Sequence, residues 1–309
     1  MPKIIVVTPA GRARYLALLS SFIVSDSSVH KWQLWDNCRD PRDREFINEL
    51  AMKNPKIEIV KLQNSRGDNR SINQYYSTLS DPEAFYIKMD DDIVFIDRGF
   101  FERFLLRAEE QRGTAVWFSP LVINNAICTW LLKYAGNIRI AQSISCQAND
   151  PIGWKSPEFR EHLHRLFLTI VSDKNIDKIR LADFSVSLSR FSINCIGFFG
   201  TDRARLGDVF CPLGVDDEEY ISAVLPMKAG LPGRVIGSEI ISHFSYFTQE
   251  KHLLRTNILS DYYALQGLKL QKFDAPKETF KQALKSTLLR VIEDRRNPMR
   301  NAPEMYLAK

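Results

Sequence analysis

The stretch FYIKMDDDIVFI, residues 85–96, decides which fold this sequence predicts. Its apolar start, residues 85–89, predicts a strand, and three adjacent carboxylates follow at Asp90, Asp91 and Asp92. Burying such carboxylates unpaired is very costly, so they must face solvent, a cation or a donor-rich pocket. Ligands of open α/β sheets bind at the carboxyl ends of strands, and hard divalent cations prefer carboxylate oxygens. The stretch therefore predicts a strand that ends in a ligand or metal site, with a solvated acidic turn as the alternative.

Strand and helix patterns alternate around this stretch through the first 120 residues. Strands are predicted over residues 3–8, 32–35, 57–62 and 85–89, and helices over 12–23, from Asp40-Pro41 onward, over 71–79, and from Asp97 as N-cap to about 111. Alternation at this pitch predicts an α/β fold with a mostly parallel sheet flanked by helices.

The second half of the chain is less regular. Strands are predicted over 116–119, 191–199 and 234–241, and helices over 156–171, 203–209 and 216–228. Residues 120–155 are rich in Asn, Ser and Gly and are expected to form a long loop, with acceptor recognition or a lid as its role. From about residue 248 onward the pattern is helical.

Composition limits the classes of protein to consider. The 309 residues are 45% hydrophobic and 26% charged, as in globular proteins, which excludes disordered, collagen-like and coiled-coil classes. Five scattered cysteines without a CxxC pair argue against a disulfide scaffold or zinc ribbon and fit a reducing, cytosolic compartment. The apolar N-terminal run is too short for a signal peptide, and no stretch approaches the roughly 18 apolar residues of a membrane span. The net charge of +5 is mild, and no basic stripe interleaved with aromatic residues supports nucleic-acid binding.

Two later features could join the acidic triplet in one site. Asp216 and Asp217 begin an acidic cluster at the start of a predicted helix, where the helix dipole alone would also stabilise carboxylates. His243 follows a predicted strand, as either a structural residue or a metal ligand.

In this order the features resemble the nucleotide-sugar glycosyltransferases of the GT-A fold, especially the family 2-like inverting enzymes, over about residues 3–245. Asp90-Asp91-Asp92 is similar to their DxD motif, Asp216-Asp217 to their later acidic pair with Asp in place of Glu, and His243 to their late metal-binding histidine. The resemblance implies a catalytic domain over 1–247, with a nucleotide-sugar-binding part at about 1–120 and an acceptor-binding part at about 120–247. A helical extension would occupy 248–309.

The resemblance also implies roles for individual residues. Asp92, His243 and Asp90 would hold Mn²⁺ or Mg²⁺, and Asp217 would be the base, with Asp216 raising its pKa by like-charge repulsion. Asp90 or Asp91 would bind ribose or sugar hydroxyls. The other implied donor-binding residues are Thr8, Pro9, Arg12, Asp36, Asn64, Gly67, Arg70 and Asn73.

The implied activity is a metal-dependent, inverting transfer of a sugar from a nucleotide-diphospho-sugar to an acceptor hydroxyl (EC 2.4 class), in polysaccharide or glycoconjugate biosynthesis. The acceptor would be a glycan or glycolipid, and the enzyme would be cytoplasmic. An apolar helical face at Phe280, Leu284, Leu288 and Val291 with basic neighbours predicts packing on the catalytic domain, a homodimer contact or peripheral binding to an anionic membrane. Three alternatives stay open: a sugar nucleotidyltransferase, a haloacid-dehalogenase-like phosphatase built on Asp90-x-Asp92-x-Val94, and a non-catalytic nucleotide-sugar or glycan-binding module.

Overall fold

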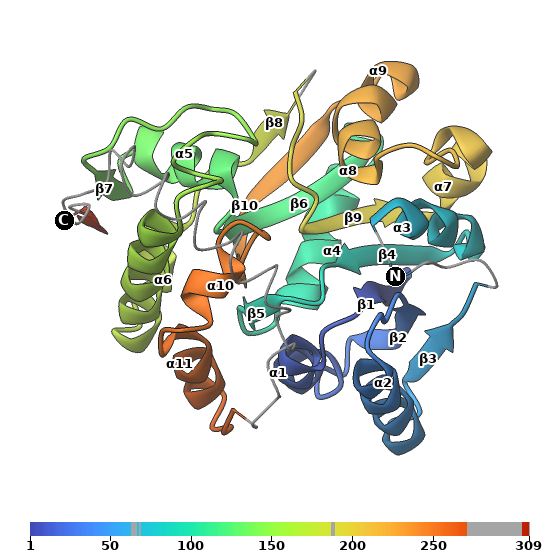
Figure 1. The fold of residues 1–309 in the computed structure, drawn as a ribbon. Coiled ribbons are helices and arrows are strands. Elements are labelled where there is room, and N and C mark those ends of the chain that lie inside the picture. The colour runs from blue at the N-terminus through green and yellow to red at the C-terminus, as the bar shows by residue number, and fades with distance from the viewer. Residues whose placement is uncertain (63–66, 68, 187–188, 271–304, 309) are drawn as a thin grey trace.

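A single nine-stranded mixed sheet runs through the computed structural model, which describes residues 1–62, 67, 69–186, 189–270 and 305–308 (Figure 1). The strand order is β3-β2-β1-β4-β9-β6-β10-β5, with β8 beside β10. The strands are β1 Lys3–Ala10, β2 Val29–Asp36, β3 Ile57–Val60, β4 Ala84–Met89, β5 Ile93–Ile96, β6 Trp117–Ile123, β8 Phe184–Val186, β9 Cys195–Phe199 and β10 Gly233–His243. The pairings orient β1, β2, β3, β4, β6 and β10 one way and β5, β8 and β9 the other. The predicted α/β class with a mostly parallel sheet flanked by helices is confirmed.

Helices cover the sheet on more than one side. They are α1 Ala13–Ile23, α2 Pro41–Lys53, α3 Asn69–Tyr75, α4 Phe100–Glu110, α5 Ala126–Tyr134, α6 Pro157–Ser172, α7 Gly200–Leu206, α8 Asp217–Glu219, α9 Leu225–Ala229, α10 Glu250–Leu253 and α11 Ile258–Leu265. Short 3₁₀ turns lie at Tyr76–Thr78, Ile176–Ile179 and Gly207–Val209, and a π-helical turn at Tyr220–Val224. Figure 1 shows α6, α10 and α11 grouped near α1, while α7, α8 and α9 gather at the opposite end of the view.

The strands of the first half form where the sequence predicts them, because their apolar runs are buried on both faces. In β1 every residue from Ile4 to Ala10 is buried, and all six residues of β4 are buried. Side-chain caps fix two helix starts: the Asp40 carboxylate accepts from the Arg42 N–H at the start of α2, and the Ser156 hydroxyl accepts from the Phe159 N–H at the start of α6.

The structure corrects the predictions for residues 120–155 and for Asp97. Residues 120–155 are not a continuous loop, since β6 extends to Ile123, α5 covers Ala126–Tyr134 and β7 covers Ile138–Ile140. The Asn pair that suggests a loop makes a sharp strand-to-helix turn: Asn124 has a left-handed φ of 68°, and the Asn125 side chain caps α5. Asp97 is not the cap of α4, which starts at Phe100, because its carboxylate pairs with Arg103 and Arg180 instead.

The chain beyond residue 248 joins the same core before it leaves the described region. Leu253, Ile258 and Tyr262 are fully buried, and the Tyr262 hydroxyl lies 3.0 Å from the Ser242 hydroxyl on β10. The described end is a strand rather than a helix, since β11 Met305–Leu307 pairs antiparallel with β7. The predicted apolar face at residues 280–291 lies outside the described residues, and the division at residue 248 stays a prediction. None of the helices in the described segments combines the length and the apolar composition that a membrane crossing requires.

Candidate active site

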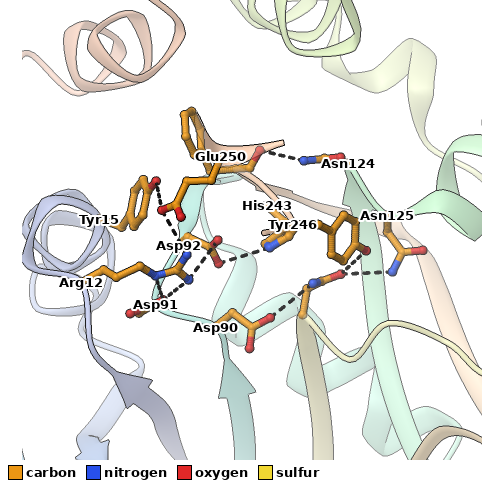
Figure 2. A network of polar contacts seen from close by, with 12 residues as sticks. Arg12, Tyr15, Asp90, Asp91, Asp92, Asn124, Asn125, His243, Tyr246 and Glu250 are labelled. Atoms are coloured by element: carbon orange, nitrogen blue, oxygen red, sulfur yellow. Dashed lines mark hydrogen bonds and ion pairs between the residues drawn. The ribbon is translucent and has the colours of Figure 1, made fainter. Parts of the chain in front are cut away.

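The carboxyl ends of five strands meet at one edge of the sheet. Since β1, β2, β4, β6 and β10 run in the same direction, the residues that follow them gather there. Arg12 follows β1, Asp90 follows β4, Asn125 follows β6 and His243 ends β10. Figure 2 shows these side chains converging from separate elements on Asp92 and its neighbours.

Asp90, Asp92 and His243 each offer a ligand atom within 4.8 Å of the other two. The antiparallel pairing of β10 with β5 sets His243 opposite Ile93, beside Asp92, and the His243 Nε2 lies 3.2 Å from the Asp92 Oδ1. Both side chains are buried. Among the described residues, neither carboxylate oxygen of Asp92 accepts a hydrogen bond of good geometry. A buried carboxylate that has charged neighbours but no hydrogen bonds fits a cation-binding role.

Arg12 already brings a positive charge to this carboxylate. Its Nη2 lies 3.0 Å from the Asp92 Oδ2 and also contacts the Asp91 Oδ1, and its Nη1 lies 3.5 Å from the Glu250 Oε1. Burial acts to raise the pKa of the Asp92 carboxyl, but Arg12 and His243 outweigh it, so that this pKa lies below its ordinary value. Asp92 is therefore ionised, and a protein cation is in contact with it.

Both carboxylate oxygens of Asp91 accept hydrogen bonds from neighbouring protein groups. One of its oxygens accepts from the Gly11 N–H at 3.1 Å, and the other accepts from the Arg12 Nε at 3.0 Å. Its side chain is only 6% exposed. Both oxygens hold the turn after β1 and the Arg12 guanidinium, and the binding of sugar or ribose hydroxyls by Asp91 stays a prediction.

Arg12→Ala is expected to destabilise the metal-free protein by about 2 kcal/mol, because it leaves the buried Asp91 and Asp92 without their cation. The expected loss is smaller than for a fully buried ion pair because the Arg12 side chain is 35% exposed. Mn²⁺ should then raise the melting temperature more in this variant than in the wild type, since it replaces the lost charge. Thermal unfolding in EDTA and in Mn²⁺ measures both effects.

Arg44→Ala is the matched control, because Arg44 also pairs with a buried carboxylate, Asp36, at 2.9 Å. Its loss of stability should be the same with and without Mn²⁺. An equal Mn²⁺ shift in Arg12→Ala, Arg44→Ala and the wild type would show that Arg12 does not share the cation site.

Lys88 is a site residue that the sequence interpretation missed. It lies in β4, is 3% exposed, and its Nζ lies 2.6 Å from the Asp90 Oδ1 and 2.9 Å from the Ile193 carbonyl oxygen. Burial opposes the charged ammonium, but Asp90 and Asp217 favour it and leave the Lys88 pKa above its ordinary value. The available signal was a single lysine in an otherwise apolar, two-face-buried strand, a position that lysine occupies only when it is paired.

The Asp217 carboxyl interacts electrostatically with both members of this ion pair, Lys88 and Asp90. Burial raises the pKa of the Asp217 carboxyl, Lys88 lowers it, and Asp90 and Asp216 raise it further, so that the net shift is upward. The Tyr76 hydroxyl donates to the Asp217 Oδ2 at 3.4 Å. The predicted like-charge effect of Asp216 on this pKa therefore has the expected direction.

Asp216 itself is a helix cap. Its Oδ1 accepts from the Glu219 N–H at 2.8 Å, and its side chain is 57% exposed. These contacts give it a structural role at the start of α8, and its catalytic role stays a prediction. Glu218, which we did not select from the sequence, is more enclosed. Burial and Asp90 raise the pKa of the Glu218 carboxyl, although its ion pair with Arg190 at 2.8 Å opposes this.

A π-helical turn follows these acids and is fixed by two side chains. Pro226 has no N–H to donate to the preceding turn, and the Trp117 indole donates to the Ile221 carbonyl oxygen at 2.9 Å.

The loop before α8 is held by Asn73, whose side-chain amide donates to the Pro212 carbonyl oxygen at 2.8 Å. Asn73 was predicted to bind the donor, but it is 1% exposed and holds this loop instead.

The predicted donor residues on β1 and β2 are mostly enclosed. Thr8 is fully buried and its hydroxyl accepts from the Trp32 indole at 3.0 Å, and Pro9 is also buried. Their side chains are therefore part of the core and not of a donor surface, because the sheet edge begins only after Ala10. Asp36 does reach that edge, but it is 7% exposed and paired with Arg44.

Of three further predicted donor residues, Asn64 and Gly67 lie between β3 and α3 in the sequence, and Arg70 lies in α3. Gly67 is buried with a φ of 68°, and a Cβ there would lie 2.9 Å from the Arg39 Cγ, so that glycine is needed for the close approach. Asn64 lies outside the described residues, and so does the side chain of Arg70. Their donor-binding roles stay predictions.

A polar network behind Asp90 was also missed. The Asn194 amide donates to the Asp90 Oδ2 at 3.3 Å, and the Asn194 Oδ1 accepts from Asn125 at 3.2 Å and from the Tyr246 hydroxyl at 3.3 Å (Figure 2). On the other side of Asp92, the Tyr15 hydroxyl donates to Glu250 at 2.8 Å. No local motif marks these residues, because they meet only through the sheet topology.

No protein-family model and no curated protein matches the sequence. Solved structures do match. One is the mannosyltransferase PcManGT from Pyrobaculum calidifontis in complex with GDP-Man and Mn²⁺, at a TM-score of 0.46 and 12% identity over 94% of this chain and 70% of that chain. Another is GalNAc-T7 with UDP, GalNAc and Mn²⁺, at 0.47 and 10% over 80% of this chain and 44% of that one. A third is S. aureus TarS 1–349, at 0.43 and 13% over 96% and 72%. Similarity at this level does not establish an activity, so the assignment of a function to this chain rests on its own side chains.

Proposed function

We propose that the protein is a metal-dependent glycosyltransferase of the GT-A type that moves a sugar from a nucleotide-diphospho-sugar to an acceptor hydroxyl. The observation that carries the proposal is the group formed by Asp90, Asp92 and His243 at the carboxyl edge of the sheet, with Asp217 nearby. The order of these residues in the chain, which resembles the DxD motif, late acidic pair and late histidine of the GT-A enzymes, supports it.

Mn²⁺ or Mg²⁺ fits the side chains present. Asp92 and Asp90 supply carboxylate oxygens and His243 an imidazole nitrogen, a donor set that suits both ions and Mn²⁺ in particular. When bound, the ion would act as a Lewis acid that neutralises charge on the departing nucleoside diphosphate. Arg12, released from part of its contact with Asp92, has the planar guanidinium that suits phosphate oxygens.

The proton of the acceptor hydroxyl would go to Asp217. A general base works best with a pKa nearer the operating pH, and burial together with Asp90 and Asp216 raises the pKa of Asp217. Lys88 favours the ionised form of this base against that upward shift, and it holds Asp90 in position through its 2.6 Å contact. Attack by an acceptor activated in this way, on the face opposite the leaving group, would invert the anomeric centre.

The wider setting is also part of the proposal. The scattered cysteines favour a cytoplasmic enzyme, and the resemblance favours a glycan or glycolipid acceptor in polysaccharide or glycoconjugate biosynthesis. The predicted C-terminal extension, 248–309, would bring the enzyme to an anionic membrane surface or to a second copy of the chain.

A screen of UDP-, GDP-, ADP- and dTDP-linked sugars with and without Mn²⁺ tests the proposal. We expect one donor to be turned over to its free nucleotide, a nucleoside diphosphate, only when the metal is present. Release of inorganic phosphate would instead indicate a phosphatase, and release of pyrophosphate in the presence of a sugar phosphate and a nucleoside triphosphate would indicate a nucleotidyltransferase. Donor binding without turnover under any of these conditions would leave a binding module.

A further inference from the structure

Four rings form a row that starts at the candidate metal site and ends in solvent. The His243 and Tyr246 rings have centroids 4.9 Å apart, Tyr246 and Trp154 are 5.9 Å apart, and Trp154 and Phe247 are 5.4 Å apart. Exposure rises along the row, from 3% at His243 and 9% at Tyr246 to 79% at Phe247. Exposed apolar side chains that continue a functional site mark a binding surface more often than isolated ones do.

Polar contacts, in addition to the packing of the rings, tie together the segments that carry the row. The Gln249 side chain is fully buried, and its amide donates to the Trp154 carbonyl oxygen at 2.6 Å while its Oε1 accepts from the Tyr246 N–H at 3.2 Å. The Thr248 hydroxyl donates to the same Trp154 carbonyl oxygen at 3.2 Å. Gln249 therefore ties the segment of Trp154 to the segment of Tyr246 and Phe247, and the rings are pre-positioned with Phe247 left open to solvent.

The inner end of the row faces the acids. The Tyr246 hydroxyl donates to Asn194, which in turn donates to Asp90, and Glu218 adds to the effect of burial in raising the pKa of Tyr246. A molecule lying along the row would thus have one end toward Asp90, which acts electrostatically on Asp217, and the other end over Phe247. The proposed acceptor must lie in this way, since its hydroxyl has to reach the base while the rest of it extends outward.

We propose that Trp154, Tyr246 and Phe247 form an acceptor platform that binds a saccharide of at least two sugar units. The proposal rests on the proposed function. A sugar ring has one face of C–H groups, which matches the negative face of an aromatic ring. Phe247 and the half-buried Trp154 offer aromatic surface of this kind, and Tyr246 lies behind them at 9% exposure. The unit beside Tyr246 would carry the reacting hydroxyl, and the next unit would stack on Trp154 and Phe247.

Titration with saccharides tests the platform, with tryptophan fluorescence and saturation-transfer NMR as readouts. The probes are cellotetraose, chitotetraose, α-mannotetraose and the matching monosaccharides. We expect the wild type to bind a tetrasaccharide more tightly than its monosaccharide, and Phe247→Ala to weaken that binding about fivefold to tenfold, the effect of losing one aromatic contact. Because Phe247 is 79% exposed, the variant should fold normally.

Tyr134→Ala is the matched control, because Tyr134 is 77% exposed and stacks on Trp130 at 4.9 Å, as Phe247 packs on Trp154. It should bind the tetrasaccharide as the wild type does. Failure of the wild type to bind any probe, or equal binding by Phe247→Ala and Tyr134→Ala, overturns the platform. So does a loss of UDP or GDP affinity in Phe247→Ala without a loss of saccharide affinity, since the rings would then stack on the nucleobase.

The outcome separates the platform from the proposed function. If the wild type turns over a nucleotide sugar but Phe247→Ala binds saccharide normally, the platform is wrong and the glycosyltransferase proposal stands. If Phe247→Ala alone loses saccharide binding and the wild type turns over no donor, the platform stands and the proposed activity fails.

Discussion

Asp92→Asn is expected to lower metal-dependent turnover of the nucleotide sugar by at least about 10²-fold while the protein stays folded. The Lewis-acid contribution of a bound ion amounts to several kcal/mol of transition-state stabilisation, and each 1.36 kcal/mol corresponds to about a tenfold change in rate. Asparagine has nearly the same shape, so the 3.2 Å approach of His243 and the Arg12 contact with Asp91 can persist. Initial rates over a Mn²⁺ series, together with Mn²⁺ binding by calorimetry, measure the effect.

The control for a general loss of stability is Glu239→Gln. Glu239 also lies in β10, is 2% exposed and pairs with Arg103 at 3.0 Å, yet it contributes nothing to the metal group. It should keep wild-type Mn²⁺ affinity and rates. Full wild-type activity in excess EDTA, or wild-type Mn²⁺ affinity in Asp92→Asn, would contradict the assignment of Asp92 as a metal ligand.

The part of the fold that the sequence predicts well is the part determined by local pattern. Continuous β-branched and apolar runs gave the strands of the first half, and Asp40 and Ser156 marked helix starts because a cap satisfies N–H groups two or three residues away. The acidic triplet was also placed correctly at a strand end, because an apolar run directly precedes it.

The predictions that failed depend on contacts between distant segments. Thr8 and Pro9 look like strand-end residues in the sequence, but β1 continues to Ala10 because β2 pairs with it as far as Asp36. Residues 120–155 look like a loop because asparagine favours turns, yet Asn124 and Asn125 make a single turn between β6 and α5. In both cases pairing with another strand, and not local composition, sets where the strand ends.

The site shows the same division. His243 and Asp92 are 151 positions apart in the chain and meet because β10 pairs with β5 in a register that sets His243 opposite Ile93. That register includes a shift between Ser242 and His243, which no sequence pattern predicts. Lys88 and Asn194 were missed because their function comes from their distance to Asp90, and neither belongs to a motif.

Asp217→Asn is expected to lower sugar transfer by about 10²–10⁴-fold, the usual contribution of a general base, with donor affinity retained. Asparagine fills the same space beside the Tyr76 hydroxyl but cannot accept a proton. In the wild type, transfer should fall on the acid side with an apparent pKa above the ordinary value of 3.8, because burial, Asp90 and Asp216 raise it. The active form is the ionised one, so the rate is high above this pKa and is lost as the pH falls through it. Single-turnover rates and donor Kd values, measured from pH 4 to 8, separate the two effects.

Glu218→Gln decides whether the correct acid has been chosen. Glu218 is adjacent, also has a raised pKa and also faces Asp90, but its carboxylate is paired with Arg190 at 2.8 Å. Among the described residues, Asp217 has no ion pair of this kind and keeps only the 3.4 Å contact from Tyr76, so its carboxylate is the more available for an acceptor proton. Glu218→Gln should therefore slow transfer far less than Asp217→Asn and leave the acid limb of the pH profile in place. If the two variants change places, with Glu218→Gln abolishing transfer and Asp217→Asn altering only donor affinity, then Glu218 is the base and Asp217 helps to hold the donor through its proximity to Lys88 and Asp90.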